Sequence, residues 1–537
     1  MNRPPMKNPQ SFSLANPVVV LLTLILGFAA CTQAPPIDED QFVVEATIAG
    51  LQTAILNEQT TCREIVQAYL DRIEAYDQST GLNAITEINP RALAKADSID
   101  QAISAGEEQG SLFCAPILVK DNFDTHDMVT TGGSIALAGS IPPDDAFMVR
   151  RIREEGAIVI AKTNMAEWAF SPRQSVSSSY DTTANAYALD RTPAGSSGGT
   201  ASGVAASFGV AGLGSDTGNS IRGPSSHLSL AGIRSTIGLT SRDGVVPLSF
   251  DRDIAGPMTR TVEDAARIFN VVAGYDPADF YTEAGRDRKE EDYTAFLDTN
   301  AVQGKRLGIL TSHANPERAD SAVYALFEEA AEELRSMGAE VVDFEIEGMR
   351  ELMSAGNWCN RFRYDMHQYL LSLGEDAPMS DVLETLETGA YGADVERILN
   401  VIAEEEPEII HPAERAEPCP DFADHAGRQA LLAAVVGAMD EAGIDAFIFP
   451  SWSYPPAPLD NANEEYRGDN SQGLIPAAGL PAITVPMGFT NGNLPAGLQI
   501  AGRPFSEGLL FGLAYAYEQG THHRRPPELF PPLAPDQ

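Results

Sequence analysis

A glycine- and serine-rich segment between Thr192 and Gly244 holds the side chains best suited to covalent chemistry. It contains the runs 193–200, Pro-Ala-Gly-Ser-Ser-Gly-Gly-Thr, and 214–224, Gly-Ser-Asp-Thr-Gly-Asn-Ser-Ile-Arg-Gly-Pro. Glycine at this density permits unusual backbone conformations and lets backbone N–H groups approach a ligand closely. An Asp, an Arg and flanking apolar, helix-forming sequence distinguish the segment from a flexible Gly/Ser spacer. We therefore expect a reactive serine here.

Two other interpretations of the glycine-rich runs compete with this one. A phosphate-binding loop would continue into Gly-Lys-Ser/Thr or match G-x-G-x-x-G, and neither run does so. The stretch 195–199 matches the nucleophile elbow G-x-S-x-G, with Ser197 in the nucleophile position. An elbow needs a buried strand before it, whereas 190–193, Asp-Arg-Thr-Pro, is polar and broken by proline. Ser197 is therefore the alternative nucleophile.

A lysine is the natural base for such a serine. Serine needs a base within hydrogen-bond reach, and the chain shows no convincing Ser/His/Asp order and no Ser-x-x-Lys. Lys120 ends the apolar run 115–119, which predicts a buried strand. Burial there would lower the pKa of its amine and make the neutral form available. Lys162 also follows an apolar run, so the residues alone leave both lysines open.

Several runs in a fixed order along the chain resemble the amidase signature family, and the likeness covers nearly the whole chain after residue 41. They are 120–124 (Lys-Asp-Asn-Phe-Asp), 195–199, 216–222 (Asp-Thr-Gly-Asn-Ser-Ile-Arg), 232–247, 253–258, 479–482 and 497–499. The resemblance implies an α/β fold with a large mixed central β-sheet flanked by helices. It also implies hydrolysis of carbon–nitrogen amide bonds, without a metal or cofactor.

The resemblance implies a Ser, cis-Ser, Lys triad. Lys120 would be the base, Ser196 a bridging serine preceded by a cis peptide bond, and Ser220 the nucleophile that forms an acyl-enzyme. Neutral Lys120 would take a proton from Ser196, which would take one from Ser220 as that oxygen attacks the carbonyl. The proton would then pass to the leaving amine.

The resemblance also implies an oxyanion hole and a brace for it. Asn219 replaces the glycine usual in the family, and asparagine tolerates left-handed backbone better than most residues. Asp216 and Arg222 are expected to support the loop rather than to touch substrate. The backbone N–H groups of the expected oxyanion hole are those of Thr217, Gly218, Asn219 and Ser220.

Strands that alternate with helices predict an α/β sheet with parallel and antiparallel members. Thr61 and Glu64 fit a capping box at the start of one further helix. The expected strands are 115–119, 157–161, 307–310, 340–344, 446–449 and 482–485, and the expected helices include 146–155 and 320–337.

The N-terminus has the features of a bacterial export signal. Residues 1–31 predict a signal peptide with a lipobox-like end, Phe-Ala-Ala-Cys, and acylation at Cys31. A plain secretory signal and a retained anchor are the alternatives. Residues 32–41 predict a tether, and 42–537 a catalytic domain with a possible covering lobe at 276–443. We expect an exported protein, periplasmic or at the cell surface, anchored by lipid.

Four further cysteines suit an oxidising compartment. The pairing that keeps each loop short is Cys62 with Cys114 and Cys359 with Cys419. No Cys-x-x-Cys is present, and the histidines show no paired ligand spacing, so no metal site is expected.

The net charge of the chain argues against one class of partner. The 36 Lys and Arg residues against 76 Asp and Glu residues give a net charge of −40, which opposes contact with nucleic acid. An amidase acting on small-molecule or peptide amides is favoured over a glutamine amidotransferase subunit that works on charged tRNA. An esterase or urethane hydrolase could use the same triad, and a binding protein on a degenerate scaffold is the non-enzymatic alternative.

The expected pocket walls are Trp358, Arg361, Trp452 and Tyr454.

Overall fold

A mixed central sheet organises the chain. The computed structural model describes residues 42–355, 359–490 and 492–534, which belong to a unit that spans Glu39–Gln537. Within them, eleven strands form one sheet in the order β1-β3-β2-β6-β8-β7-β12-β13-β11-β9-β10. The strands are β1 Ile85–Ile88, β2 Pro116–Lys120, β3 Ile158–Thr163, β6 Ala211–Asp216, β7 Ala231–Arg234, β8 Ile254–Thr259, β9 Arg306–Leu310, β10 Glu340–Phe344, β11 Ala446–Pro450, β12 Ala482–Thr490 and β13 Leu494–Ala501.

Both strand directions occur in this sheet. β2 pairs in parallel with β3 and β6, and β9 pairs in parallel with β10 and β11. The remaining ladders, including β12 with β13, are antiparallel. The predicted fold class is therefore confirmed. A separate ribbon pairs β4 Val176–Ser177 with β5 Asp181–Thr182.

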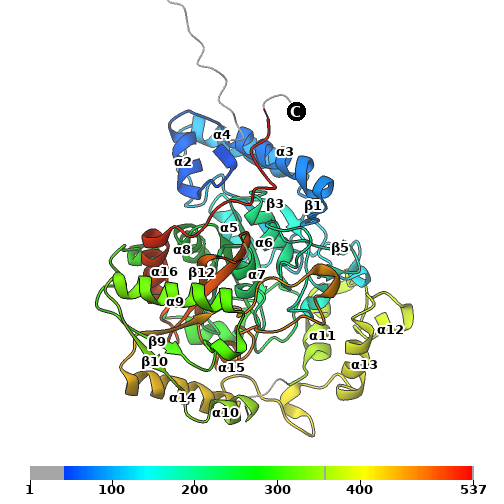
Figure 1. The fold of residues 1–537 in the computed structure, drawn as a ribbon. Helices are drawn as coiled ribbons and strands as arrows, with labels where there is room; N and C mark the ends of the chain where they lie inside the picture. Colours follow the sequence, from blue (N-terminus) through cyan, green and yellow to red (C-terminus); the bar gives the residue numbers. More distant parts are fainter. Residues whose placement is uncertain (1–41, 356–358, 491, 535–537) are drawn as a thin grey trace, which may run out of the picture. The chain divides into compact units, whose positions relative to one another are not determined.

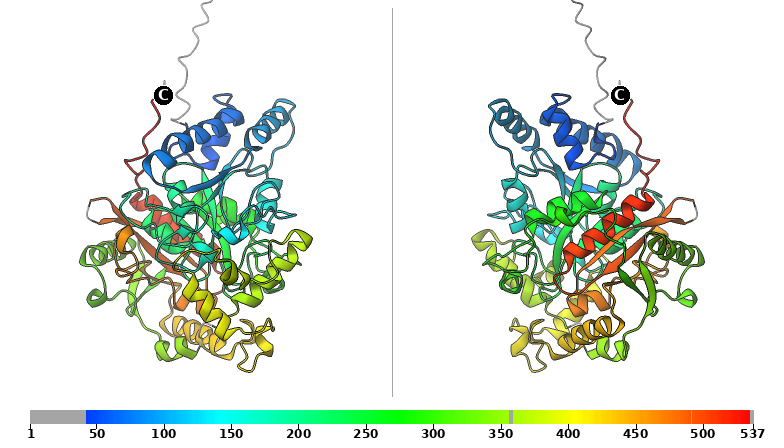
Figure 2. Two further views of the ribbon diagram at one scale, coloured as in Figure 1. Left: turned by 90° about the vertical axis from the view of Figure 1, so that its right-hand side faces the viewer. Right: turned by 90° about the vertical axis from the view of Figure 1, so that its left-hand side faces the viewer.

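Helices flank the sheet in all three ribbon views (Figures 1 and 2). The helices are α2 Ile48–Leu56, α3 Cys62–Thr80, α4 Ala92–Ser104, α5 Phe147–Glu154, α6 Gly198–Ala205, α7 Arg222–His227, α8 Val262–Val272, α9 Ser321–Ser336, α10 Met349–Ala355, α11 Phe362–Ser372, α12 Glu384–Thr388, α13 Glu396–Glu405, α14 Ala426–Ala442, α15 Leu474–Ala478 and α16 Glu507–Thr521. In the part of the chain that the structure describes, no helix is both long and apolar enough to cross a bilayer.

Local sequence signals set the bounds of α3. The Thr61 hydroxyl accepts from the Glu64 N–H at 3.2 Å, and the Glu64 carboxylate accepts from the Thr61 N–H at 2.8 Å. This capping box satisfies two N–H groups that the first helical turn leaves free. The helix ends at Gly81, whose φ of 77° is a left-handed conformation that glycine adopts without strain. The predicted capping box is confirmed.

The parallel pairing of β2 and β6 places the chemistry-bearing residues. Lys120 is the last residue of β2, and Asp216 is the last residue of β6. Because adjacent parallel strands end at the same edge of a sheet, the segments that follow them emerge side by side. The loop that holds Ser220 follows Asp216 at this edge.

The covering lobe expected at 276–443 stays a prediction, and part of that range contributes strands to the central sheet. Residues 306–344 contain β9, α9 and β10, and both strands belong to the central sheet. One of two smaller hydrophobic clusters in the described residues draws on α11 and α13, from Phe362 to Ile402, packed with Trp168 and Leu137.

Two disulfides tie the described chain. Cys62 and Cys114 bond across 52 residues with their Cα atoms 5.6 Å apart, and Cys359 and Cys419 bond across 60 residues at 6.2 Å. Both pairings agree with those expected. The first joins the start of α3 to the segment before β2, and the second closes the segment that contains α11–α13.

Removing the first disulfide should lower stability measurably. The double variant Cys62→Ala, Cys114→Ala frees a loop of 52 residues in the unfolded chain, which costs roughly 2–4 kcal/mol of unfolding free energy. Urea unfolding followed by circular dichroism, with the unmodified chain fully oxidised, measures this difference. An unchanged midpoint in the double variant would contradict it.

Candidate active site

Lys120 is a buried amine held by two serine hydroxyls. Its Nζ lies 2.7 Å from Ser196 Oγ and 2.8 Å from Ser215 Oγ, and its side chain is fully buried. Burial lowers the pKa of Lys120 to about 7, although the carboxylates of Asp253 and Asp216 act in the opposite direction. A large fraction of this amine is therefore neutral near pH 7 and free to accept a proton.

Ser196 is fixed by the backbone on both sides. The peptide bond between Gly195 and Ser196 is cis. A Cβ at position 195 would overlap the carbonyl oxygens of Ser171 and Gln174, so only glycine fits there. The Ser196 carbonyl accepts hydrogen bonds from the Ala166 N–H, at 3.1 Å, and from the Ser175 hydroxyl, at 3.3 Å.

The loop after β6 lines a cavity of ≈ 270 Å³. The four residues of the loop, 217–220, all line it, and Ser220 keeps 5% of its surface exposed. None of their backbone N–H groups donates a hydrogen bond to another of the described residues. The residues that line the cavity therefore include four whose N–H groups have no hydrogen-bond partner in the described chain, as donors to a bound oxygen would need.

The carboxylate of Asp216 holds this loop in place through hydrogen bonds. It accepts from the N–H of Ile221 at 3.1 Å, from the guanidinium of Arg222 at 3.1 Å and from that of Arg234 at 3.0 Å. Arg222 also donates to the Gly218 carbonyl, at 2.6 Å. Burial alone would raise the pKa of Asp216, but the two guanidiniums outweigh it and hold the pKa at about 2. Asp216 and Arg222 thus make the contacts expected of loop supports.

Neutralising Asp216 should destabilise the fold. Asp216→Asn leaves two fully buried guanidiniums without their counter-ion, which costs about 3–5 kcal/mol of unfolding free energy. Because the folded pKa lies below the ordinary value of 3.8, the stabilisation is complete above that value and is lost as pH falls toward 2. Thermal unfolding at pH 7 and pH 3 measures both effects.

The exposed Asp190 offers a matched control for that experiment. Its side chain is 79% exposed, so Asp190→Asn should change stability by no more than about 0.5 kcal/mol. Equal melting temperatures for the two asparagine variants at pH 7 would contradict the bracing role of Asp216.

Lys162, the alternative base, and Ser197, the alternative nucleophile, lie away from the cavity at Ser220. Lys162 donates to the Phe123 carbonyl at 2.7 Å and to Thr130 Oγ1 at 2.8 Å, and it makes no hydrogen bond to Ser196 among the described residues. Ser197 is fully buried, and its hydroxyl donates to the Ser215 carbonyl at 3.1 Å. Neither lines the cavity that holds Ser220.

Only some of the residues expected to wall the pocket line the cavity at Ser220. Arg361 lines it, whereas Trp452 and Tyr454 do not, and Trp358 lies outside the described residues. Trp452 packs instead on His227, with ring centroids 4.6 Å apart. The aromatic walls come from Phe170 and Phe362, two residues that the sequence did not single out.

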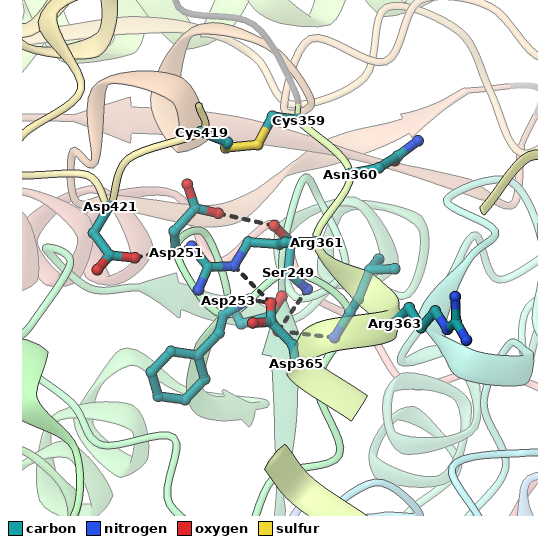
Figure 3. A network of polar contacts seen from close by, with 12 residues as sticks. Ser249, Asp251, Asp253, Cys359, Asn360, Arg361, Arg363, Asp365, Cys419 and Asp421 are labelled. Atoms are coloured by element: carbon teal, nitrogen blue, oxygen red, sulfur yellow. Dashed lines mark hydrogen bonds and ion pairs between the residues drawn. A yellow bond between two sulfur atoms is a disulfide. The ribbon is translucent and has the colours of Figure 1, made fainter. Parts of the chain in front are cut away.

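Arg361 is held by a network of acidic side chains (Figure 3). Its guanidinium donates to Asp365 at 2.7 Å and to Asp421 at 2.9 Å. Asp365 also accepts from the Phe250 N–H at 2.8 Å, which ties the wall to the loop before β8. The disulfide between Cys359 and Cys419 lies beside this network in Figure 3.

Sequence reasoning missed three groups that support the loop and the amine. Ser215 is the second partner of Lys120 and also accepts from the Asn122 amide at 3.0 Å. Asp253 accepts from Thr217 Oγ1 at 2.5 Å, and Arg234 shares Asp216 with Arg222. Arg234 is the last residue of β7 and Ser215 is the residue before the last of β6, and this place near a strand end is the one signal that could have drawn attention to them.

One group of side chains in the described residues has the composition of a metal site. His126, Asp127 and Asp145 bring their ligand atoms within 4.8 Å of one another. The Arg153 guanidinium already lies 2.6 Å from Asp127 and 3.5 Å from Asp145, so its positive charge occupies this place. The expectation that the reaction uses no metal stays a prediction.

Comparison with known proteins identifies the class. Residues 64–511 match the family Amidase. The structure resembles that of native peptide amidase from Stenotrophomonas maltophilia, with a TM-score of 0.79 and 34% identity over 91% of this chain and 99% of that one. It also resembles an amidase family protein from Bacillus anthracis, with a TM-score of 0.78 and 30% identity over 91% and 94%.

Curated relatives include a further kind of protein. The chain is 32% identical over 503 residues to a glutamyl-tRNA(Gln) amidotransferase subunit of Cyanothece sp., and the match covers 90% of this chain and 100% of that protein. The chain therefore belongs to the amidase family, and the resemblance noted from its motifs is confirmed. It is an enzyme of the class that acts on carbon–nitrogen amide bonds.

Proposed function

We propose that the chain hydrolyses linear carboxamides through an acyl-enzyme on Ser220, with Ser196 and Lys120 as the proton relay. One observation carries this proposal: the Lys120 amine is buried and lies 2.7 Å from Ser196 Oγ, at the sheet edge from which the Ser220 loop emerges. The free N–H groups of that loop supply the second requirement of acyl transfer, a set of donors for the developing oxyanion.

The proposed reaction has two halves. Ser220 Oγ attacks the amide carbon while its proton passes to Ser196, whose own proton passes to the neutral Lys120 amine. The negative oxygen of the tetrahedral intermediate accepts from the N–H groups of 217–220. Collapse of the intermediate breaks the C–N bond, and the relay returns a proton to the departing nitrogen. Water then attacks the acyl group through the same relay and releases the carboxylic acid.

Peptide-type amides are the substrates that we favour. The likeness to the peptide amidase extends over 91% of this chain, and the cavity at Ser220 carries the apolar residues Phe170, Phe362 and Ile402 beside its polar loop. The same triad would serve esters and urethanes, which the substrate panel below includes.

The amidotransferase relatives support a second candidate, in which the chain releases ammonia from glutamine for tRNA-bound glutamate. The net charge of −40 opposes this candidate, because the partner would be a polyanion. We therefore place it second.

A substrate panel separates these candidates. The purified chain is incubated with a peptide amide, an aryl amide, glutamine, an ester and a urethane, and the released ammonia, amine or alcohol is measured for each. We expect turnover of the peptide amide without any partner protein. If glutamine is the only substrate that is turned over, and if its turnover requires the other amidotransferase proteins, the proposal is overturned in favour of the second candidate.

We also propose that the enzyme is exported and anchored by a lipid on Cys31, a residue outside the described part of the chain. The signal-like sequence of 1–31 and the two disulfides, which suit an oxidising compartment, support this location. Labelled palmitate should attach to the chain expressed in a bacterium and not to Cys31→Ser. Equal labelling of both would contradict the anchor.

A further inference from the structure

A second hollow of ≈ 580 Å³ adjoins the cavity at Ser220. The two share four lining residues, Phe170, Pro172, Arg397 and Ile398. The first pair follows the short helix Glu167–Ala169, and the second pair lies on α13. A substrate that reacts at Ser220 can therefore extend between these two elements into the second hollow.

Two guanidiniums from different elements line this second hollow. Arg397 is exposed on α13 and lines both cavities. Arg173 follows the short helix Glu167–Ala169; it donates to Asn463 Oδ1 at 3.1 Å, and its guanidinium carbon lies 4.8 Å from the ring centroid of Tyr466. Its Nε is covered and has no acceptor among the described residues. Within the same residues, neither guanidinium pairs with a carboxylate.

The surrounding arginines behave differently. Arg361, Arg363 and Arg415 each pair with an acid of the same region, at 2.7, 2.5 and 2.6 Å. Unlike these three, Arg397 and Arg173 make no ion pair with another of the described residues, and both line the second hollow.

The acids that line the hollow do not neutralise these charges. The Glu167 carboxylate is 3% exposed and accepts from the Ser134 hydroxyl at 2.7 Å and from the Gly392 N–H at 2.9 Å. Burial raises its pKa, although the hydrogen bonds from Ser134 and Gly392 act in the opposite direction. Asp394 is exposed and makes no ion pair with another of the described residues. The hollow thus offers two guanidinium forks against one exposed acid.

We propose that this hollow is a subsite for a carboxylate of the substrate, and that Arg397 and Arg173 determine specificity for it. Guanidinium forks bind carboxylates through paired, charge-assisted hydrogen bonds. The inference rests on the proposed hydrolysis at Ser220 and adds a substrate class: amides that carry an acidic group beyond the reacting carbonyl, such as peptide amides with a glutamate near the reacting end.

Matched substrates test the subsite. Two peptide amides differ only by Glu or Gln at the residue before the amidated one, and the measured quantity is the ratio of their kcat/KM values. We expect a ratio of about ten for the unmodified chain at low salt, falling as salt screens the charges. Arg397→Gln should lower the ratio about tenfold, and Arg397→Glu should invert it. Arg335→Gln on α9, far along the chain, should leave ratio and activity unchanged.

Binding to Ser220→Ala reads the subsite without turnover. Calorimetry should show that adding Arg397→Gln weakens binding of the Glu peptide amide about tenfold more than that of the Gln peptide amide. If Arg397→Gln changes neither the kcat/KM ratio nor the difference in binding, the subsite proposal is overturned, while the proposed amide hydrolysis still stands. The reverse pattern, with selective binding but no hydrolysis of any amide, would overturn the proposed reaction and keep the subsite.

Discussion

Ser220→Ala is expected to lower kcat/KM for a peptide amide by at least about 10⁴-fold while leaving the fold unchanged. The reason is chemical: without the hydroxyl there is no oxygen to form the acyl-enzyme, and only the backbone donors and substrate positioning remain. Ser220 is 5% exposed at the cavity and makes no hydrogen bond through its hydroxyl to another of the described residues. Its loss should therefore leave the melting temperature within a few degrees of the original value.

Ser197→Ala is the matched control for this variant. Its hydroxyl lies one residue from Ser196 but donates to the Ser215 carbonyl instead of lining the cavity. We expect it to retain activity within about tenfold, at the cost of one buried hydrogen bond worth about 1 kcal/mol. Full activity in Ser220→Ala together with none in Ser197→Ala would move the nucleophile to position 197.

Lys120 should set the lower pH limit of the enzyme. The base must be neutral to accept a proton, and burial places the pKa of Lys120 at about 7. Below that pH the amine is protonated, so kcat/KM should fall about tenfold per pH unit, whereas above it the rate should level off. A profile of kcat/KM between pH 5 and 9, with a substrate that does not titrate there, measures the midpoint.

Replacements of Lys120 separate its basicity from its packing. Lys120→Met fills similar space without the amine, and we expect a loss of at least about 10³-fold. Lys120→Arg keeps a positive charge but stays protonated at every working pH, so it should not restore the rate. Activity in Lys120→Arg equal to that of the unmodified chain would exclude an uncharged base at this position. A flat profile between pH 5 and 9 would exclude it as well.

The sequence was sufficient for the elements with strong local signals. The capping box at Thr61 and the apolar runs that became β2 and β3 depend on neighbours in the chain, so their positions could be predicted closely. The contact between Lys120 and Ser196 spans 76 residues and came from the family resemblance rather than from any local pattern.

Other parts depend on tertiary contacts that no local pattern encodes. Ser215 resembles any small residue in a strand, yet the pairing of β2 with β6 brings its hydroxyl to Lys120. The expected walls lay after residue 275 and included Trp452, but Trp452 packs on His227, and Phe170 and Phe362 form the aromatic wall. Whether a side chain faces the cavity or the core is decided by packing between segments far apart in the chain. A single sequence does not show these contacts.

Mass-spectrometric mapping of a covalent adduct tests the central claim most directly. The full chain is treated with a fluorophosphonate at pH 8, digested, and searched for the modified serine, with a heat-unfolded sample to exclude nonspecific reaction. We predict one adduct, on Ser220, which disappears in Lys120→Met. An adduct on Ser196 or Ser197 instead, or labelling of Ser220 that persists unchanged without Lys120, would contradict the proposed relay.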